Sequence, residues 1–554
     1  MTLIRLSILL ALMMLGLGGQ RTCSDESLIP ATAFDTLVIC PAEFQSSLSE
    51  WILYRQKQGH SIQVVAPARS AVGVTDQIRQ VADSNPLKFV FLIGDVGRQR
   101  DLATVPTHYV AAKVIQLFGS EPDIATDNPY ADLDGDGLPE LALGRLPADS
   151  AAEVRGFLDR VIAYETNAMQ DQTWRRNINF VAGVGGFGGV LDNLVEHTAK
   201  QIITELVPQH YQTSMTFGSW RSPYCPDPRQ FSQTAIGRFN EGCLFWVYIG
   251  HGQPTKLDRV HLPDQSHSVM DQDSAQHVCC VAGNPIAIFL SCYTGAIDHR
   301  EDCLAETILR QPCGPIAAIC GTRVTMPYAL SLLSLEIVNE YFSGKVETLG
   351  ELVCLAKRRI VETDHEPLDD ENLVSNPYRE MILGMGKLLS PRPDLLRAEC
   401  LEHAHLIHVL GDPLLRLKRP EKIDVISIEQ VESSDELRIA GISPTAGELC
   451  VELVYRRDRF RQRPPFRSDY RPSDKEFRSY QTVYLNSHDL TCDGCHQLVK
   501  SGPFQLSLRV PGDASGECVV RCMLSAPNSF ALGSSAVQIK PSAVIRSARR
   551  TESK

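Results

Sequence analysis

The chain has 554 residues, of which 43% are hydrophobic and 22% are charged, so it resembles a globular protein with large cores and not a disordered one. Its formal net charge is −12, and no sustained basic stripe interrupts this acidic balance, which argues against a nucleic-acid-binding protein. The length predicts about two to four domains.

Residues 1–20 have the pattern of a secretory signal peptide. Arg5 supplies the positive charge, and an apolar segment too short to span a bilayer runs from Leu6 to Leu17. No later stretch is long and apolar enough for a membrane helix, so we expect no integral membrane segment after signal removal. We expect the protein to be secreted, periplasmic or at the cell surface, where disulfides among its 17 cysteines are permitted.

A first α/β subdomain is predicted over residues 28–168. Strand-like apolar runs alternate there with helical patterns, which predicts a mostly parallel sheet with helices on its faces. The last helix begins at Ser150, an N-cap residue, with Glu153 at the capping-box position. The three clearest strand-like runs are Asp35–Pro41, Ile62–Val65 and Lys88–Asp95.

An acidic loop in this subdomain has the start of a calcium-binding pattern. Asp132, Asp134 and Asp136 occupy alternate positions, and Gly137 follows the third acid. Carboxylate oxygens suit calcium, and glycine allows a sharp turn. The twelfth position of the loop is Leu143 instead of glutamate, so this is not a complete EF-hand loop. The pattern predicts a structural calcium ion at the three aspartates; the alternative is an acidic turn without an ion.

A second α/β subdomain is predicted over residues 172–418. After its first strand, Gly183–Gly188 matches the G-x-G-x-x-G fingerprint of dinucleotide-binding proteins. That fingerprint also requires an acid after the next strand to hold the ribose, and Tyr211–Phe217 offers none. We therefore favour a glycine-rich loop at the sheet edge over an oxidoreductase that binds a dinucleotide.

Two apolar runs in this subdomain end in residues with catalytic chemistry. Leu244–Ile249 is followed by Gly250-His251-Gly252, and Ile286–Leu290 is followed by Ser291 and Cys292. Both runs are typical of buried parallel strands, whose carboxyl ends form ligand sites in α/β sheets. A thiol near an imidazole is readily held as the nucleophilic thiolate. This predicts a cysteine peptidase with a His251–Cys292 dyad; the alternative is a buried cysteine and an unrelated turn histidine.

Residues 421–541 have the alternating pattern of a small β-sandwich, plausibly immunoglobulin-like. Cys492 to His496 matches the C-x-x-C-H haem-attachment pattern, but a β-rich module is a poor context for that haem. Cys518 and Cys522 complete a candidate zinc set with Cys492 and Cys495, and disulfides are the favoured alternative. The runs that we assign to strands are Leu449–Tyr455, Tyr480–Leu485, Phe504–Val510 and Cys518–Met523.

Together, these motifs resemble the gingipain family of secreted cysteine peptidases over roughly residues 35–418. The resemblance rests on the order and spacing of several short motifs: Leu92-Ile93-Gly94-Asp95, Gly144-Arg145, Gly250-His251-Gly252, the strand leading into Cys292, Leu304-Ala305-Glu306 and Leu410-Gly411-Asp412-Pro413. It implies a caspase-like α/β fold followed by an immunoglobulin-like domain, and an endopeptidase that acts on peptides or proteins without a cofactor in its chemistry.

The resemblance also implies roles for individual residues. Cys292 would attack the peptide carbonyl, and His251 would activate the thiol or protonate the leaving amine. The backbone N–H groups of Gly252 and Cys292 would bind the oxyanion. Asp192 falls near the position of an aspartate that lines the primary pocket of arginine-specific members, and Glu196 is expected one helical turn later, which implies a preference for basic residues. The alternative is that Asp192 is an acid at a helix N-terminus, where the helix dipole alone favours it.

One position departs from the family pattern. Where gingipains carry a glutamate thought to orient the histidine, this chain has Val184, which accepts no hydrogen bond through its side chain. The alternative function is therefore a catalytically inactive homologue that acts as a surface or protein-binding module.

Overall fold

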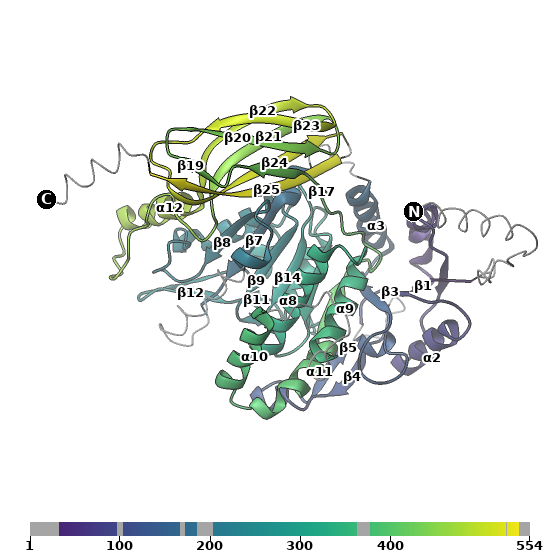
Figure 1. Ribbon diagram of the computed structural model, residues 1–554. Coiled ribbons are helices and arrows are strands. Elements are labelled where there is room, and N and C mark those ends of the chain that lie inside the picture. Colours follow the sequence, from purple (N-terminus) through teal and green to yellow (C-terminus); the bar gives the residue numbers. More distant parts are fainter. Residues whose placement is uncertain are drawn as a thin grey trace, which may run out of the picture.

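One ten-stranded sheet forms the centre of the protein in the computed structural model, which describes residues 33–96, 104–166, 172–184, 203–362, 377–527 and 529–541. Figure 1 shows this sheet with helices packed against it and the C-terminal β domain at one end. In spatial order its strands are β2 (Ile62–Val65), β1 (Thr36–Ile39), β3 (Phe89–Ile93), β6 (Ala142–Leu146), β16 (Ile407–Leu410), β15 (Ala317–Gly321), β14 (Ile286–Leu290), β9 (Phe245–Ile249), β7 (Asn177–Ala182) and β8 (Gln212–Phe217).

The sheet consists of two parallel halves that meet at one antiparallel pair. All neighbours are parallel except β15 and β16, which pair antiparallel from Ala318↔Leu410 to Gly321↔Ile407. β16 comes from the end of the second predicted subdomain, yet it pairs in parallel with β6 of the first, at Leu410↔Arg145. The two predicted α/β subdomains therefore share one continuous sheet.

Helices cover the strands, which explains why strands such as β3 and β14 are apolar throughout. Every residue of β3 is buried, as expected for a parallel strand with layers on both faces. Ser150 caps its helix as predicted, because its hydroxyl accepts the Glu153 N–H at 3.3 Å. The helices of this region are α1 (Ser49–Lys57), α2 (Ala71–Ala82), α3 (Ala151–Glu165), α5 (Phe231–Asn240), α6 (Gln272–Ala275), α7 (Leu304–Arg310), α8 (Pro327–Ser343), α9 (Leu349–Glu362), α10 (Pro377–Leu389) and α11 (Leu396–Leu406).

Three short antiparallel hairpins leave the main sheet. They are β4 (His108–Ala111) with β5 (Asp123–Thr126), β10 (Gly252–Gln253) with β11 (Lys256–Leu257), and β12 (Arg259–His261) with β13 (Ser266–Ser268). The sequence analysis did not predict these hairpins, because their strands are too short to carry a periodic pattern.

The C-terminal region forms two sheets around their own hydrophobic core. One sheet has the order β17–β25–β24–β21–β22, with β19 also on β25, and the other has the order β18–β20–β23. The α/β fold class followed by a β domain is thus confirmed, while the immunoglobulin-like classification stays a prediction. The strands are β17 (Glu421–Lys422), β18 (Asp424–Ser427), β19 (Gln430–Glu432), β20 (Glu436–Ser443), β21 (Gly447–Tyr455), β22 (Thr491–Val499), β23 (Gly502–Arg509), β24 (Gly516–Ala526) and β25 (Ser529–Lys540).

The strand predicted over Tyr480–Leu485 is wrong, because these residues lie in helix α12 (Asp474–His488). Phe477, Tyr480 and Tyr484 are buried at helical spacing, and the Ser473 hydroxyl accepts the Glu476 N–H at the helix start. The aromatic content of this segment suggested a strand, but its period is that of a helix.

Helix α12 attaches the β domain to the edge of the main sheet, as Figure 1 shows beside β8. The Met215 N–H of edge strand β8 donates to His488 Nε2 at 3.0 Å, and Thr216 Oγ1 lies 2.8 Å from the Tyr484 hydroxyl. The described residues contain no helix long and apolar enough to cross a membrane. The predicted signal peptide, residues 1–20, lies outside the described residues.

A buried ionic cluster joins the end of strand β16 to helices α1 and α3 of the first predicted subdomain. Arg55 on α1 lies 2.9 Å from Glu165 on α3 and 2.6 Å from Asp412 after β16, and all three side chains are fully buried. Asp412 also accepts the Trp51 indole N–H at 2.6 Å and the Leu414 N–H at 2.8 Å. Its carboxylate therefore connects chain segments that lie more than 350 positions apart in the sequence.

Substitution Asp412→Ala is expected to reduce the free energy of unfolding by roughly 3–5 kcal/mol, because it leaves the Trp51 indole N–H without an acceptor and the Arg55 guanidinium with Glu165 as its remaining ionic partner in the interior. Urea denaturation of the whole chain measures this loss. Asp394→Ala removes a carboxylate from an exposed pair with Arg392 and serves as the control, with no change in midpoint expected. Equal midpoints for both variants would contradict the structural role of Asp412.

Candidate active site

The His251 and Cys292 loops leave the sheet side by side. Strands β9 and β14 are adjacent and parallel, and their last residues, Ile249 and Leu290, are paired. His251 and Cys292 each stand two positions beyond this pair, at the carboxyl edge of the sheet. The sheet register thus brings to one edge two residues that are 41 positions apart in the sequence (292 − 251).

Glycine on either side of His251 allows the two loops to touch. Gly250 has φ +154°, a conformation that side-chain-bearing residues rarely adopt. A Cβ on Gly252 would lie 2.4 Å from the Cys292 carbonyl oxygen and 3.0 Å from the Ser291 hydroxyl. Only glycine fits at position 252, and its backbone is packed directly against the backbone of Cys292.

The Cys292 thiol is partly exposed and has polar neighbours from the next strand end. The Thr325 N–H donates to Sγ at 3.3 Å, and the Thr325 hydroxyl lies 3.7 Å from Sγ. Cys243 and Cys303 lie elsewhere, fully buried, and burial raises the pKa of both thiols well above the usual value. Cys292 therefore has both the exposure and a hydrogen-bond donor that suit a reactive thiol, whereas burial makes the other two thiols inaccessible.

The residue after Cys292 holds the loop in a strained turn. Tyr293 has φ +59°, the left-handed region that non-glycine residues seldom occupy. Its N–H donates to the Arg323 carbonyl at 3.1 Å, and its hydroxyl donates to Glu121 at 2.8 Å. Burial and this hydrogen bond raise the pKa of the Tyr293 phenol to about 12. Arg323 is held in turn by Asp298, at 2.8 and 2.7 Å, so the loop is tied to its neighbours on both sides.

Below the histidine, a buried tyrosine bonds to the loop backbone. The Tyr248 hydroxyl donates to the His251 carbonyl at 2.8 Å and accepts the Asp258 N–H at 3.2 Å. Asp258 also lies over the end of β7: a Cβ on Gly183 would be 2.8 Å from its Oδ2. Val184 follows Gly183 here, so the carboxylate nearest to the end of β7 comes from Asp258 and not from position 184.

The predicted metal loop has its three aspartates together. One carboxylate oxygen from each of Asp132, Asp134 and Asp136 lies within 4.8 Å of the others. Asp132 is buried and accepts the N–H groups of Gly135 at 2.6 Å and Gly137 at 2.9 Å. Among the described residues no ion pair engages these three carboxylates. The donor set of clustered hard oxygens fits a calcium ion, and the same backbone bonds also suit an acidic turn.

The four cysteines of the candidate zinc set are not gathered around one point. Within the described ranges, the three aspartates above are the only group whose ligand atoms have metal-binding proximity. The Cys492 thiol on β22 instead hydrogen-bonds the Cys518 thiol on β24, and His496 pairs with Glu448 at 3.2 Å. All sixteen described cysteines carry free thiols in this structure, so the disulfides expected there are not formed.

Besides the signal peptide, two predicted features lie outside the described residues. These are Asp192, the expected pocket residue, and the part of the glycine-rich loop from Gly185 to Gly188. Sequence reasoning missed Thr325, Tyr293, Glu121 and Tyr248, which surround the two candidate residues. The signal that was available for Thr325 was its place just after buried strand β15, at the same edge of the sheet.

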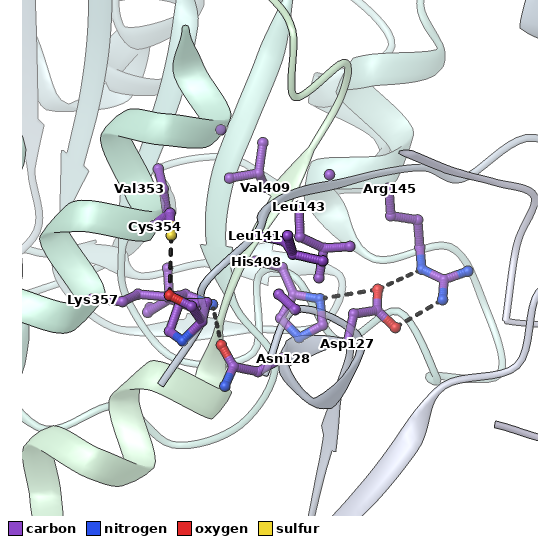
Figure 2. Close-up of a pocket in the computed structure, with 15 residues that line it drawn as sticks. Asp127, Asn128, Leu141, Leu143, Arg145, Val353, Cys354, Lys357, His408 and Val409 are labelled. Carbon is purple, nitrogen blue, oxygen red and sulfur yellow. Dashed lines mark hydrogen bonds and ion pairs between the residues drawn. The ribbon is translucent and has the colours of Figure 1, made fainter. Parts of the chain in front are cut away.

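A polar cavity lies at the other half of the sheet, between β6, β16 and α9 (Figure 2). It encloses about 20 Å³, which is room for a water molecule but not for a peptide or a nucleotide. Lys357 lines it and donates to Asn128 at 3.1 Å, and burial lowers the pKa of this lysine to about 8. Asp127 pairs there with Arg145 at 2.7 Å. This ion pair connects β6 to the segment before it, and the cavity beside it is too small to be a substrate site.

Comparison with known proteins agrees with this geometry. The family model for Peptidase family C25 matches residues 29–418. The chain belongs to Peptidase family C25. The family assignment confirms the gingipain resemblance, and it covers the entire ten-stranded sheet together with both candidate residues.

The individual relatives have low sequence identity to this chain. The chain is 24% identical to Gingipain R2 of Porphyromonas gingivalis over 325 residues, which is 56% of this chain and 39% of the relative. It is 22% identical to Lys-gingipain of the same organism over 298 residues, 52% of this chain and 15% of that one. The matched part thus spans well under half the length of these curated relatives.

The same fold occurs in the solved structure of the Arg-specific cysteine proteinase gingipain R. The superposition has a TM-score of 0.51 at 15% identity and covers 92% of this chain and 99% of that one. It therefore includes the C-terminal β domain as well as the α/β sheet.

Proposed function

We propose that this protein is a cysteine endopeptidase in which Cys292 is the nucleophile and His251 is the general acid and base. The observation that carries the proposal is the pairing of β9 with β14, which sets both residues at one sheet edge, with Gly252 against the Cys292 backbone. Membership of Peptidase family C25 supports the same chemistry.

The reaction follows from these positions. The Cys292 sulfur attacks the substrate carbonyl carbon, and the thiol proton passes to His251, which returns it to the leaving amine as the C–N bond breaks. Water then attacks the thioester, and the sulfur leaves as the free thiol when its proton is restored. The N–H groups of Gly252 and Cys292 donate to the oxyanion in both steps.

The neighbours of the thiol assist this chemistry in our proposal. The Thr325 N–H already donates to Sγ, and a hydrogen bond to the charged form of a group favours that form. The thiolate is therefore stabilised by a backbone donor as well as by His251. This contribution does not depend on a carboxylate at position 184.

The dyad is tested by labelling the purified, reduced protein with a peptidyl acyloxymethyl ketone. Cys292→Ala and His251→Ala are each expected to abolish labelling and to lower kcat at least about 10³-fold, because the group transfer loses its nucleophile or its proton carrier. Cys354→Ala is the matched control, because burial raises the pKa of that partly exposed thiol to about 11. The Cys354→Ala variant should be labelled to the same extent as the unaltered protein. Failure of the unaltered protein to label or to cleave peptides would instead favour the inactive binding homologue.

We also propose a preference for basic residues before the cleaved bond, with Asp192 as the pocket residue. The relatives named Arg-specific and Lys-gingipain support a cationic substrate, and the acid at position 192 offers the opposite charge.

Substitution Asp192→Ala is expected to lower kcat/KM at least about tenfold for peptides with arginine or lysine at that position, and to leave kcat/KM for uncharged peptides unchanged, because the ion pair with the substrate cation is lost. Glu196→Ala, four positions further along the sequence, is the comparison variant. A native enzyme without any preference for a cation would rule this proposal out.

We propose a structural calcium ion at Asp132, Asp134 and Asp136, whose carboxylate oxygens already gather within 4.8 Å of one another. Because such an ion binds the folded state and not the unfolded chain, it stabilises the folded state by about 2.7 kcal/mol at a free calcium concentration of 100 times Kd.

Addition of calcium is accordingly expected to raise the Tm of the native protein and not that of the Asp132→Asn/Asp134→Asn variant. Scanning calorimetry with calcium, with magnesium and with a chelator measures the shift. Asp513→Asn, in an exposed turn, is the control that should keep the calcium response. An identical Tm in calcium and chelator would show that the loop is an acidic turn without an ion.

A further inference from the structure

A buried tyrosine hydroxyl, that of Tyr248, bonds to the main chain of His251. Tyr248 is the fourth residue of β9, is fully buried, and donates to the His251 carbonyl at 2.8 Å. Its second polar contact is the Asp258 N–H, which donates to the same oxygen at 3.2 Å. Because that contact uses the oxygen as acceptor, the hydroxyl proton remains directed to the His251 carbonyl.

This carbonyl belongs to the same peptide unit as the Gly252 N–H. In a trans peptide the C=O and the following N–H point in opposite directions within one plane. Fixing the His251 carbonyl toward the interior therefore fixes the Gly252 N–H in the opposite direction.

The Gly252 N–H is also left out of the adjacent hairpin. Gly252 pairs with Leu257 in the β10–β11 ladder, and antiparallel pairs alternate between hydrogen-bonded and non-bonded types. The Leu257 N–H donates outward to the Met270 carbonyl at 2.8 Å, so the Gly252–Leu257 pair is the non-bonded type. The Gly252 N–H thus points away from β11, on the side where its backbone meets Cys292.

Without a restraint, this peptide unit would reorient easily. Gly252 must be glycine because of the Cys292 carbonyl, and Gly250 has a conformation open mainly to glycine, so the chain on both sides of His251 is conformationally permissive. Burial raises the pKa of the Tyr248 phenol far above its usual value, so the hydroxyl keeps its proton at every working pH.

We infer that Tyr248 is a positioning residue for the oxyanion hole: its hydroxyl holds the His251–Gly252 peptide so that the Gly252 N–H faces the carbonyl oxygen of a substrate bound at Cys292. This inference rests on the proposed peptidase function. It assigns to Tyr248 an action on the oxyanion and not on the proton transfer between Cys292 and His251.

Substitution Tyr248→Phe tests this role, because it removes only the hydroxyl. We expect kcat to fall about 10- to 100-fold with KM little changed, below the 10²–10³-fold cost of deleting an oxyanion donor. The affinity for a peptidyl aldehyde, whose adduct with Cys292 carries an oxygen in the hole, should fall by a similar factor. The rate of Cys292 alkylation by iodoacetamide, across pH 5–9, should stay within about twofold, since that reaction forms no oxyanion.

Tyr130→Phe is the matched control, because Tyr130 is equally buried and its hydroxyl donates to a backbone carbonyl, that of Pro106, away from the two candidate loops. Tyr130→Phe should leave kcat, the affinity for the aldehyde and the rate of Cys292 alkylation unchanged. If Tyr248→Phe does not fold, 3-fluorotyrosine at position 248 keeps the hydroxyl and should keep both activity and aldehyde affinity, whereas 4-fluorophenylalanine there should lose both.

The possible results separate the two hypotheses. Unchanged aldehyde affinity in Tyr248→Phe overturns the positioning role, and so does an alkylation rate that falls as far as kcat, which would place the hydroxyl's action on the dyad. A native protein that alkylates at Cys292 but neither cleaves peptides nor binds the aldehyde overturns the proposed peptidase function and this inference with it.

Discussion

The parallel pairing of β9 with β14 is the constraint on which the rest of the site depends. Ile249 and Leu290 are partners in that ladder, so the residues two positions later leave the sheet together. A slip of one position in either strand would exchange its two faces and move Trp246 or Phe289 to the opposite layer of the core. Since both faces are covered by helices and loops, these large side chains would then have to pack in spaces that other residues fill. The hydrophobic core therefore specifies the register, and the register brings His251 to Cys292.

The sheet itself is held together where its two halves meet. β16 arrives from the end of the α/β region and inserts between β15 and β6, so it completes the fold only after the whole region has been made. Asp412, two positions after β16, then contacts Arg55 and Trp51 of helix α1. Buried charges of this kind contribute more to the choice of one arrangement than to net stability, because their desolvation offsets much of their attraction. The two predicted subdomains are thus separate along the sequence, but their strands form one sheet because β16 of the second pairs with β6 of the first.

The sequence alone predicted the parts of this protein that depend on local pattern. Uninterrupted apolar residues predict buried strands such as Phe245–Ile249, and residue type and spacing predict the Ser150 cap. The C-terminal helix was misread as a strand, since aromatic residues favour strands in composition while the spacing of Tyr480 and Tyr484 favours a helix. The contacts of Glu121 with Tyr293 and of Thr325 with Cys292 join positions 172 and 33 residues apart, and no local pattern encodes them.

These long-range contacts bear on how the site functions with valine at position 184. A carboxylate beside the histidine has one effect, which is to orient and charge-stabilise the imidazole. In this chain the described partners of the two loops act instead on the backbone and on the thiol: Tyr248 on the His251 carbonyl, Arg323 on the Tyr293 N–H, and Thr325 on Sγ. A loop that is rich in glycine gains close approach and loses rigidity, and each of these bonds restores rigidity at one peptide unit. In the proposed mechanism, organisation of the oxyanion donors and of the thiolate therefore depends on hydrogen bonds that need no acid at position 184, and the imidazole of His251 carries out the proton transfer.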